Sequence, residues 1–465
     1  MKRLCFLLLL LAAALPACAF KKPAAAPDQG LMTMEGALAN RYLRADKPGT
    51  VLARLRIATR APELTRSGAV NVVLVLDTSG SMEGQPITDA RAAALAMIDT
   101  LADGDHLAVV AFGSRVEVLL PATELDSGNR LTARKSIEAM KAEGTTDLAG
   151  GLRKGLEQAQ KYLDPHGVNR IVLVGDGVPN DESPIRQLAS GAADQAIPIT
   201  VLGLGPDYNE TLMGAVAQLS GGQFHYVRES AEVATFFKSE VLRLKQVYAR
   251  NAGVDVQPGP GVRIESVVGQ PTTMAGNGSV HIALGDISRT DTRDLVVRVT
   301  TDPHRAGASV ELFDAVLTFE DAWGDGERVE RRVFLGAKAT ASDDELTKGR
   351  NPDVEDTAAT MQAAATTVQA IEMVRNGESE QARAVLDQAA DFADNDTSGS
   401  APSVQRGNAR KLRSLRSSLP TPPPAAPSPA AGMAPPMSPR RSAPSKSSLP
   451  PAVREAHDEA MQLLQ

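Results

Sequence analysis

The sequence has almost no cysteine and few aromatic side chains. Cys5 and Cys18 are the two cysteines among 465 residues. Both precede residue 19, so the folded part of the chain has no cysteine for a disulfide framework, a zinc cluster or a catalytic thiol. Aromatic residues make up 3% of the chain against 43% for all hydrophobic residues, so aliphatic side chains must build the cores.

An excess of basic residues is also missing. The chain has 49 Lys and Arg residues against 56 Asp and Glu, a net charge of −7, and therefore lacks the concentrated basic face that nucleic-acid binding requires. The GxSxG nucleophile turn and the GxxxxGK(S/T) phosphate loop are absent. The six histidines include no pair with the HExxH spacing of a zinc protease. We therefore expect a protein that is not an enzyme.

Long hydrophobic runs are confined to the first residues of the chain. Beyond residue 20 no stretch approaches the ~18 apolar residues of a membrane-spanning helix. The run Leu4–Leu15 follows Lys2 and Arg3, and it is shorter than the ~20 residues that a span needs. A basic start followed by a short apolar run is typical of a secretory signal peptide, here residues 1–18.

The end of this run, Leu15-Pro16-Ala17-Cys18, resembles the lipobox of bacterial lipoproteins, from which Pro16 departs. The resemblance implies that Cys18 is lipidated and becomes the first residue of the mature protein. Plain cleavage, with Ala17 and Ala19 as the small residues, and an uncleaved anchor are the two alternatives. All three place the chain outside the cytoplasm, in the bacterial cell envelope. The outer membrane is favoured, because Ala19 rather than Asp follows Cys18.

Strands and helices alternate between residues 69 and 245, as in a parallel sheet covered by helices on both faces. The run Asn71–Asp77 is apolar at nearly every position, which is typical of a central strand buried on both sides. We therefore predict an α/β domain with a doubly wound, mostly parallel six-stranded sheet. Its strands are expected at 71–77, 106–112, 116–120, 170–175, 199–204 and 223–227.

Residues 250–340 contain strand-like runs without helices between them, which predicts an antiparallel β-sandwich after the α/β domain. Residues 50–60 are also strand-like and are expected to join this sandwich as an extra strand. The other strands of the sandwich are expected at 262–268, 279–284, 294–300, 308–320 and 327–335.

The remaining segments differ in composition from these two domains. Residues 19–49 are interpreted as a tether, and 353–394 as a helical hairpin. Residues 397–450 are rich in Pro, Ser and Ala and are predicted to be a disordered spacer, followed by a short helix at 451–465. Basic residues in the spacer are interpreted as solvated: Arg406, Arg410, Lys411, Arg413 and Arg416.

Oxygen-bearing side chains gather where predicted strands end. Asp77-Thr78-Ser79-Gly80-Ser81 closes the first strand, and Asp176 follows the fourth. Thr145 lies in a loop before a predicted helix. In a doubly wound sheet the ligand crevice lies at the carboxyl ends of the strands where the strand order reverses, between the first and fourth strands. The sequence therefore predicts that Asp77 and Asp176 meet there.

Residues 70–245 resemble a von Willebrand factor type A (VWA) domain, and these side chains match its metal-ion-dependent adhesion site. The resemblance implies that Ser79, Ser81 and Thr145 coordinate a divalent ion, directly or through water. It also implies that Asp77 and Asp176 hold the ion through direct or water-mediated contacts. The strands around the domain are similar to those of the bacterial branch labelled calcium-activated-chloride-channel-like.

The chemistry of these residues agrees with the resemblance. Mg²⁺ prefers about six oxygen ligands in octahedral geometry and releases its waters reluctantly. Two carboxylates and three hydroxyls suit Mg²⁺, or Mn²⁺ or Ca²⁺, and leave a position for a carboxylate from a partner. Asp147 is either a further ligand or the cap of the helix that begins there. Asp181 and Glu182 either modulate the site or are solvated loop charges.

We expect an exported, lipid-anchored protein that binds a partner protein through a divalent ion, which an acidic residue of the partner completes. One alternative is an assembly subunit of a cell-envelope complex that uses the sandwich and the tail as its interface. Another is a metal-dependent hydrolase, for which the sequence offers no general base beside the site.

Overall fold

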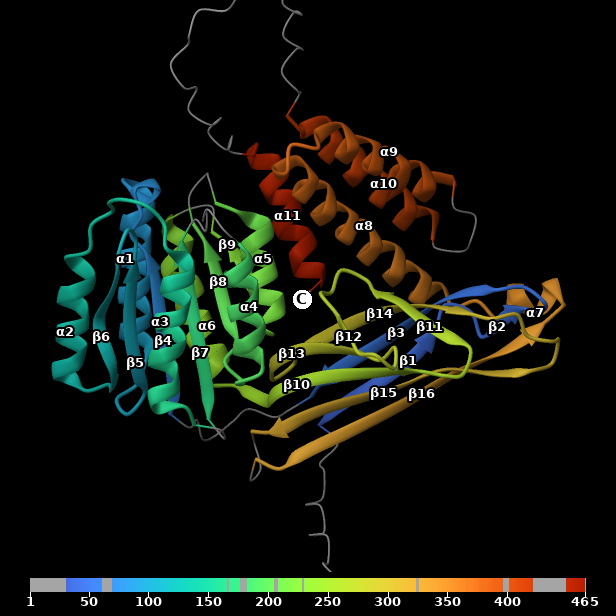
Figure 1. Cartoon of the computed structure of the whole chain (residues 1–465), viewed down its shortest axis with the longest axis horizontal. Helices are drawn as coiled ribbons and strands as arrows, with labels where there is room; N and C mark the ends of the chain where they lie inside the picture. Colours follow the sequence, from blue (N-terminus) through green and yellow to red (C-terminus); the bar gives the residue numbers. More distant parts are fainter. Residues whose placement is uncertain are drawn as a thin grey trace, which may run out of the picture.

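The computed structural model of the chain describes residues 31–60, 69–164, 167–175, 182–204, 208–227, 230–322, 326–395, 401–420 and 449–464. The predicted signal peptide with Cys18 lies outside these ranges, and so does Asp176. The described chain folds into three parts, an α/β domain, a β-sandwich and a helical module (Figure 1). Within these ranges, no helix is both long enough and apolar enough to cross a bilayer.

The predicted doubly wound, mostly parallel six-stranded sheet is confirmed. Its strands lie in the order β6-β5-β4-β7-β8-β9, and each neighbouring pair is parallel except β5 and β6. All residues of β4 are buried, which explains its unbroken apolar sequence. The strands are β4 (Val70–Asp77), β5 (His106–Phe112), β6 (Val116–Glu124), β7 (Val168–Gly175), β8 (Ile199–Gly203) and β9 (Phe224–Tyr226).

Helices cover both faces of this sheet. The side chains of Val72 and Leu74 pack with α1, α2 and α6, whereas those of Val73 and Val75 pack with α3, α4 and α5. Because side chains alternate along a strand, one apolar strand supplies both cores. The helices are α1 (Gln85–Thr100), α2 (Ser127–Glu138), α3 (Leu148–Ala159), α4 (Ser183–Ala193), α5 (Glu210–Leu219) and α6 (Ser230–Leu244).

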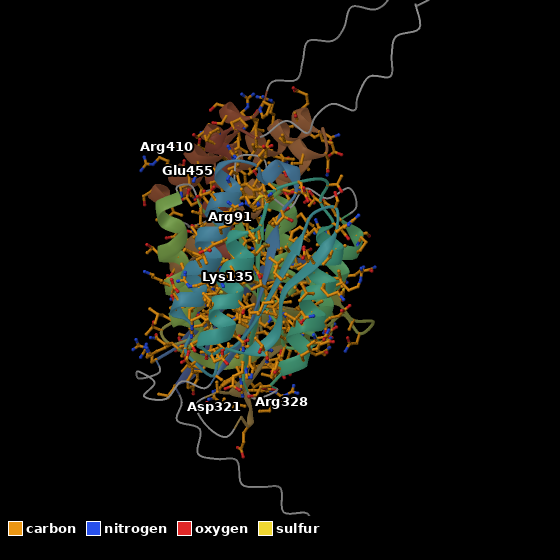
Figure 2. All side chains as sticks on the ribbon, turned by 90° about the vertical axis from the view of Figure 1, so that its left-hand side faces the viewer. Arg91, Lys135, Asp321, Arg328, Arg410 and Glu455 are labelled. Carbon is orange, nitrogen blue, oxygen red and sulfur yellow. The ribbon has the colours of Figure 1, made fainter. Side chains whose placement is uncertain are left out.

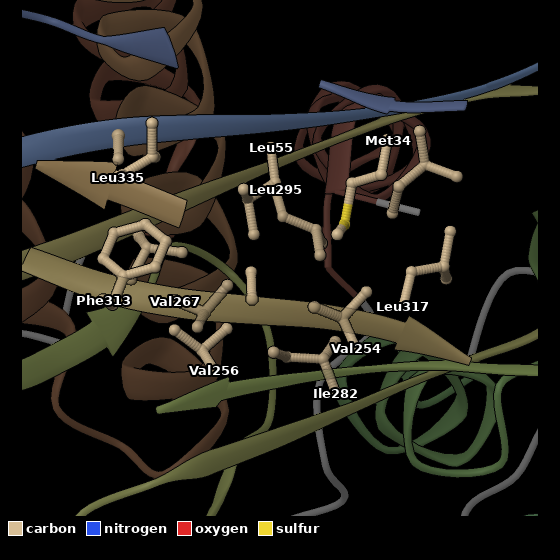
Figure 3. Close-up of a cluster of buried hydrophobic side chains, with 14 of the residues drawn as sticks. Met34, Leu55, Val254, Val256, Val267, Ile282, Leu295, Phe313, Leu317 and Leu335 are labelled. Atoms are coloured by element: carbon tan, nitrogen blue, oxygen red, sulfur yellow. The ribbon is translucent and has the colours of Figure 1, made fainter. Parts of the chain in front are cut away.

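The β-sandwich has one sheet of order β1-β3-β14-β11 and a second of order β12-β13-β10-β15-β16-β2. All strand pairs are antiparallel except β16 and β2. Aliphatic side chains from both sheets fill the space between them, with Met34 and Leu295 from one sheet and Val254 and Leu317 from the other (Figure 3). The strands are β1 (Met32–Leu38), β2 (Tyr42–Arg44), β3 (Gly49–Thr59), β10 (Val247–Pro258), β11 (Val262–Val267), β12 (Thr273–Met274), β13 (Val280–Ser288), β14 (Thr292–Thr301), β15 (Ser309–Asp321) and β16 (Arg328–Thr340).

The residues before the α/β domain contribute three strands rather than one. The expected extra strand is β3, which lies in the middle of its sheet between β1 and β14. The interpretation of residues 19–49 as a tether is wrong for β1 and β2. In β1, Met32 and Met34 are buried while Thr33 and Glu35 are exposed, so the strand presents one apolar side to the sandwich core.

The sequence did not predict β10, although it lies between β13 and β15 in the second sheet. Its pairing shifts register between Ala249 and Gly253, and Asn251 has a positive φ of 47°. An irregularity of this kind breaks the two-residue alternation by which a strand is recognised in a sequence.

Buried charges join the α/β domain to the sandwich. Arg170 of β7 donates to Asp286 of β13 over 2.8 Å, and both side chains are buried. Burial lowers the pKa of Arg170, and Asp286 and Glu240 oppose that shift. Glu240 of α6 accepts from Arg243 at 3.0 Å and from the hydroxyl of Thr200 at 2.9 Å. An ion pair of this kind fixes how two parts meet, because either charge alone would be costly to bury.

The helical module contains α8 (Pro352–Arg375), α9 (Ser379–Asn395), α10 (Pro402–Ser418) and α11 (Pro451–Leu464), preceded by the short α7 (Asp343–Lys348). The prediction of a disordered spacer over residues 397–450 is wrong for α10. Ala409, Leu412 and Leu415 form a buried stripe at helical spacing on this helix. Most of the spacer, residues 421–448, lies outside the described ranges.

The basic residues of α10 are only partly the solvated charges that the sequence suggested. Arg413 pairs with Asp391 of α9 at 3.0 Å, and Arg416 pairs with Asp387 of the same helix at 2.8 Å. Arg410 is exposed on the outer surface of the module (Figure 2). These exposed ion pairs add to the contact with α9 that the buried apolar stripe of α10 makes.

The helix α11 lies between the α/β domain and the rest of the helical module (Figure 1). Its His457 is fully buried, and the imidazole ring lies edge-to-face against the ring of Phe224 of β9, with 5.7 Å between the ring centroids. Burial lowers the pKa of His457 to about 3, so its ring is neutral. Asp458 accepts a hydrogen bond from the backbone N–H of Tyr226 at 3.3 Å.

The helix α8 reaches the same side of the α/β domain. Arg375 in its last turn donates to the carboxylate of Glu210 and to the backbone carbonyl of Tyr208, at the start of α5. Glu210 is fully buried, and this burial raises the pKa of its carboxyl, while Arg375 acts in the opposite direction.

We predict that Arg375→Met lowers the free energy of unfolding at neutral pH by about 3–5 kcal/mol, because it leaves a buried carboxylate without its cation. The raised pKa of Glu210 means that the folded protein keeps this proton to higher pH than the unfolded chain, whose reference value is 4.5. The contribution of the group to stability is therefore full below that value and is lost as pH rises through the folded-state pKa.

Removing Arg375 raises the folded-state pKa further, so the loss in the variant should shrink when the pH falls to about 4. Urea unfolding at neutral and acidic pH measures this. The double variant Arg375→Met/Glu210→Gln should recover most of the stability at neutral pH. An equal loss at both pH values would contradict the assignment.

Candidate functional site

The predicted ligand Asp77 lies at the edge of the sheet where the strand order reverses. The chain passes from β4 to its neighbour β5 on one side, and β7 pairs with β4 on the other. Connections from the two inner strands therefore leave in opposite directions and open a crevice at the carboxyl ends. Asp77 is the last residue of β4, at that crevice.

Asp77 and the two serines after it form one compact turn. The carboxylate of Asp77 is fully buried, and its Oδ1 accepts a hydrogen bond from the backbone N–H of Ser79 at 2.8 Å. The turn continues into the short helix η1 (Gly80–Met82), on which Ser81 lies. The hydroxyls of Ser79 and Ser81 are 3.0 Å apart. The turn therefore brings both serine oxygens together beside a buried carboxylate.

The loop that carries Thr145 is fastened to this turn by backbone hydrogen bonds. The N–H of Gly80 donates to the carbonyl of Gly144 at 3.0 Å, and the N–H of Glu143 donates to the carbonyl of Thr78 at 2.8 Å. Gly144 has a φ of +80°, and a Cβ there would lie 1.9 Å from the Oγ of Ser114. A glycine is therefore required for the loop to approach so closely.

Sequence reasoning missed Ser114, which positions Thr145. Its hydroxyl accepts a hydrogen bond from the backbone N–H of Thr145 at 2.8 Å and lies 3.3 Å from the Oγ1 of the same residue. The signal was available, because Ser114 follows β5 directly after Gly113 and β5 is the neighbour of β4. A polar residue at that strand end faces the same crevice.

Asp176 lies outside the described residues. Its predecessor Gly175 ends β7, and a Cβ on Gly175 would lie 2.5 Å from the Cβ of Asp77. The described part of β7 thus passes directly against Asp77. Asp181 is also outside the described ranges, whereas Glu182 accepts a hydrogen bond from Asn209, the residue that caps α5, at 2.9 Å.

The alternative interpretations of Asp147 are resolved in favour of the cap. Its Oδ1 accepts a hydrogen bond from the backbone N–H of Gly150 at 2.9 Å at the start of α3. A carboxylate in this position satisfies a free N–H of the first turn and interacts favourably with the helix dipole.

The oxygen set suits a hard divalent cation. Adjacent ligands of an octahedral ion with bonds of ~2.1 Å lie ~3.0 Å apart. The hydroxyls of Ser79 and Ser81 are hydrogen-bonded to each other at 3.0 Å, a separation that also suits adjacent ligands of one ion, and the carboxylate of Asp77 lies beside them. Over the described ranges, no three or more His, Cys, Asp or Glu side chains gather as a metal cluster.

The region around the site matches a known protein family. The sequence model of the family described as "von Willebrand factor type A domain" matches residues 70–226. The matched segment runs from the first residue of β4 to the last of β9, and so contains the whole doubly wound sheet.

Curated relatives share this region and part of its surroundings. An uncharacterised protein of Synechocystis sp. is 30% identical over 268 residues, which cover 55% of this chain and 63% of the relative. The uncharacterised protein YfbK of Escherichia coli is 26% identical over 200 residues, covering 41% of this chain and 34% of the relative. Inter-alpha-trypsin inhibitor heavy chain H1 of Mesocricetus auratus is 30% identical over 175 residues, covering 35% and 19%. The chain thus spans less than two thirds of the length of these relatives.

Solved structures resemble a larger part of the chain. A von Willebrand factor type A protein from Catenulispora acidiphila superposes with a TM-score of 0.66 at 19% identity, over 85% of this chain and 91% of that one. The ArnB paralog VWA2 from Sulfolobus acidocaldarius has a TM-score of 0.54 at 18% identity, over 83% and 94%. At these identities the likeness concerns the fold alone.

We predict that Asp147→Ala lowers the free energy of unfolding by about 1 kcal/mol, because it removes the cap of α3, whereas Asp147→Asn preserves it. Thermal unfolding of both variants measures this. If Asp147 acted as a metal ligand instead, Asn would weaken the binding of a divalent ion as strongly as Ala does.

Proposed function

Residues 70–226 form a von Willebrand factor type A domain, and we propose that this protein uses the domain to bind a partner protein through a divalent metal ion. Domains of this family typically mediate protein–protein interactions. The main support for this proposal is that Asp77, Ser79 and Ser81 lie together at the sheet edge where the strand order reverses. The 3.0 Å between the two serine hydroxyls also suits adjacent ligands of one octahedral ion.

The residues of the turn would hold the ion in distinct ways. Asp77 supplies negative charge from a buried position, and its hydrogen bond to the N–H of Ser79 keeps the carboxylate oriented. Ser79 and Ser81 supply neutral oxygens. Thr145 would supply another from the neighbouring loop, where the hydroxyl of Ser114 accepts a hydrogen bond from its backbone N–H. Asp176, outside the described residues, is proposed as the second carboxylate.

A bound Mg²⁺, Mn²⁺ or Ca²⁺ would offer a coordination position to a carboxylate of the partner. Two carboxylates leave a divalent ion without excess negative charge around it, so a third carboxylate is not repelled. The partner is therefore proposed to present an exposed acidic residue. Binding of this kind needs no general base and no catalytic residue.

We predict that Asp77→Ala weakens the binding of Mg²⁺ or Mn²⁺ by at least about 100-fold, since even groups that only orient metal ligands contribute 10–100-fold. Isothermal titration calorimetry of the full chain without its predicted signal segment measures this. The full chain is needed because α8 and α11 pack against the domain.

Asp99→Ala is the matched control, because Asp99 is an exposed carboxylate in the last turn of α1, at the opposite end of that helix from the turn after β4. This variant should bind the ion like the unaltered protein. Ser79→Ala and Thr145→Ala should weaken binding with little change in thermal stability. Equal affinity of the unaltered protein and the Asp77 variant would refute the site.

We also propose that the protein is exported and anchored by a lipid on Cys18. Its proposed location is the cell envelope, and the outer membrane in particular. The support is the basic and apolar start of the sequence together with its lipobox-like end. In a bacterial host, Cys18→Ser should abolish the incorporation of labelled palmitate and release the protein from the membrane fraction. Unchanged labelling would contradict the anchor.

A further inference from the structure

A cavity of about 590 Å³ lies between the sandwich and the helical module. Its walls come from β2 and β3 on one side and from α8, α9 and α10 on the other. None of the described residues that line it belongs to the α/β domain, so it is separate from the proposed metal site. Its volume is in the range of sites for small organic ligands, ~300–1,000 Å³.

Small side chains create this space. The facing sides of α8 and α9 carry Ala359, Ala363, Ala389 and Ala393 at the cavity wall, opposite Leu52 of β3. Larger apolar residues at these positions would fill the gap, as they do in the sandwich core. This part of the wall is therefore apolar, and the side chains of the described chain leave space beside it.

One exposed aromatic side chain lies at this cavity. Phe392 of α9 is 71% exposed and is among the residues that line the cavity. A large apolar side chain left in water beside a cavity marks a surface that a ligand covers. An apolar ligand in the cavity would bury the Phe392 ring.

The charges at the wall favour an anionic group on that ligand. Arg298 of β14 donates to the amide oxygen of Gln362 at 2.9 Å, and no carboxylate of the described chain pairs with it. Glu355, the acidic residue of the lining, is already bonded to Arg350 at 3.0 Å. The cavity thus has one positive charge that is not neutralised, and a carboxylate or similar anion would complement it.

We propose that this cavity binds a long-chain fatty acid, with the hydrocarbon chain along the alanine wall and beneath Phe392. The carboxylate lies at Arg298, whose guanidinium is held in place by Gln362. This ligand combines the two properties that the wall requires, a long apolar chain and a single negative charge. The site is independent of the metal-dependent binding proposed above.

The test is a titration of the delipidated full chain, without its predicted signal segment, with the fluorescent fatty acid cis-parinaric acid and with palmitic acid as competitor. Saturable binding that palmitic acid reverses is expected. Arg298→Gln should lower the affinity for palmitic acid by at least about tenfold, as expected for loss of a charged hydrogen bond. Hexadecanol, which has no charge, should compete equally well for the variant and for the unaltered protein. Arg263→Gln, an exposed arginine of β11 outside the cavity, is the matched control.

Ala389→Trp places a large ring inside the cavity and should abolish binding of the acid and the alcohol alike. Ala384→Trp is its matched control, because Ala384 lies exposed on the same helix. Ala359→Leu provides a smaller obstruction from α8 if the tryptophan variant does not fold. Absence of saturable binding, as a peptide or protein occupant would produce, overturns the proposal. Undiminished binding by the folded, obstructed variants overturns it too, and an unchanged affinity of Arg298→Gln for the acid overturns the assigned carboxylate position.

Discussion

The parallel pairing of β4 with β7 is the constraint on which the candidate site depends. Both strands are buried along their length, and Gly175 lets β7 pass within contact distance of Asp77. Because the chain order reverses between them, the connections that follow leave toward opposite faces of the sheet. A crevice then opens above the two strand ends, and backbone hydrogen bonds from the turn after β4 fasten the loop of Thr145 to its rim. The turn after β4 and the loop of Thr145 therefore lie side by side as a consequence of strand order.

Buried charge pairs orient the three parts of the molecule. Arg170 and Asp286 join the α/β domain to the sandwich, and Arg375 and Glu210 join the helical module to the α/β domain. Apolar contacts alone tolerate sliding, whereas a buried charge must meet its counterpart. The second pair lies at the start of α5, whose capping residue Asn209 also binds Glu182 from the connection after β7. The helical module therefore contacts the same edge of the sheet that carries the candidate metal site.

The cavity beside the helical module and the turn Asp77–Ser81 are two different kinds of candidate binding surface. At the turn, polar atoms are held by short-range hydrogen bonds, and the space between them is small. Between α8, α9 and the sandwich, alanine side chains leave a volume that the chain does not fill, with one unneutralised arginine at its wall. The first arrangement suits an ion, and the second suits a long apolar molecule with a charged end.

Local patterns in the sequence determined much of this protein. The apolar run of β4, the oxygen residues that follow it and the helix cap at Asp147 each depend on neighbours within a few positions, so they were predictable. The doubly wound sheet and the convergence toward Asp77 followed from those patterns and the general rule for strand order.

Several other features are visible only in the tertiary structure. The alternation in β10 is interrupted at Asn251. The strand β1 is held by its pairing with β3, and α10 by its packing on α9, and neither contact shows in the local sequence pattern. The contact of Ser114 with Thr145 and the cavity beside Phe392 likewise join distant segments. Hydrogen-bonding and packing energies between such segments arise only when the whole chain has folded, so no local spacing encodes them.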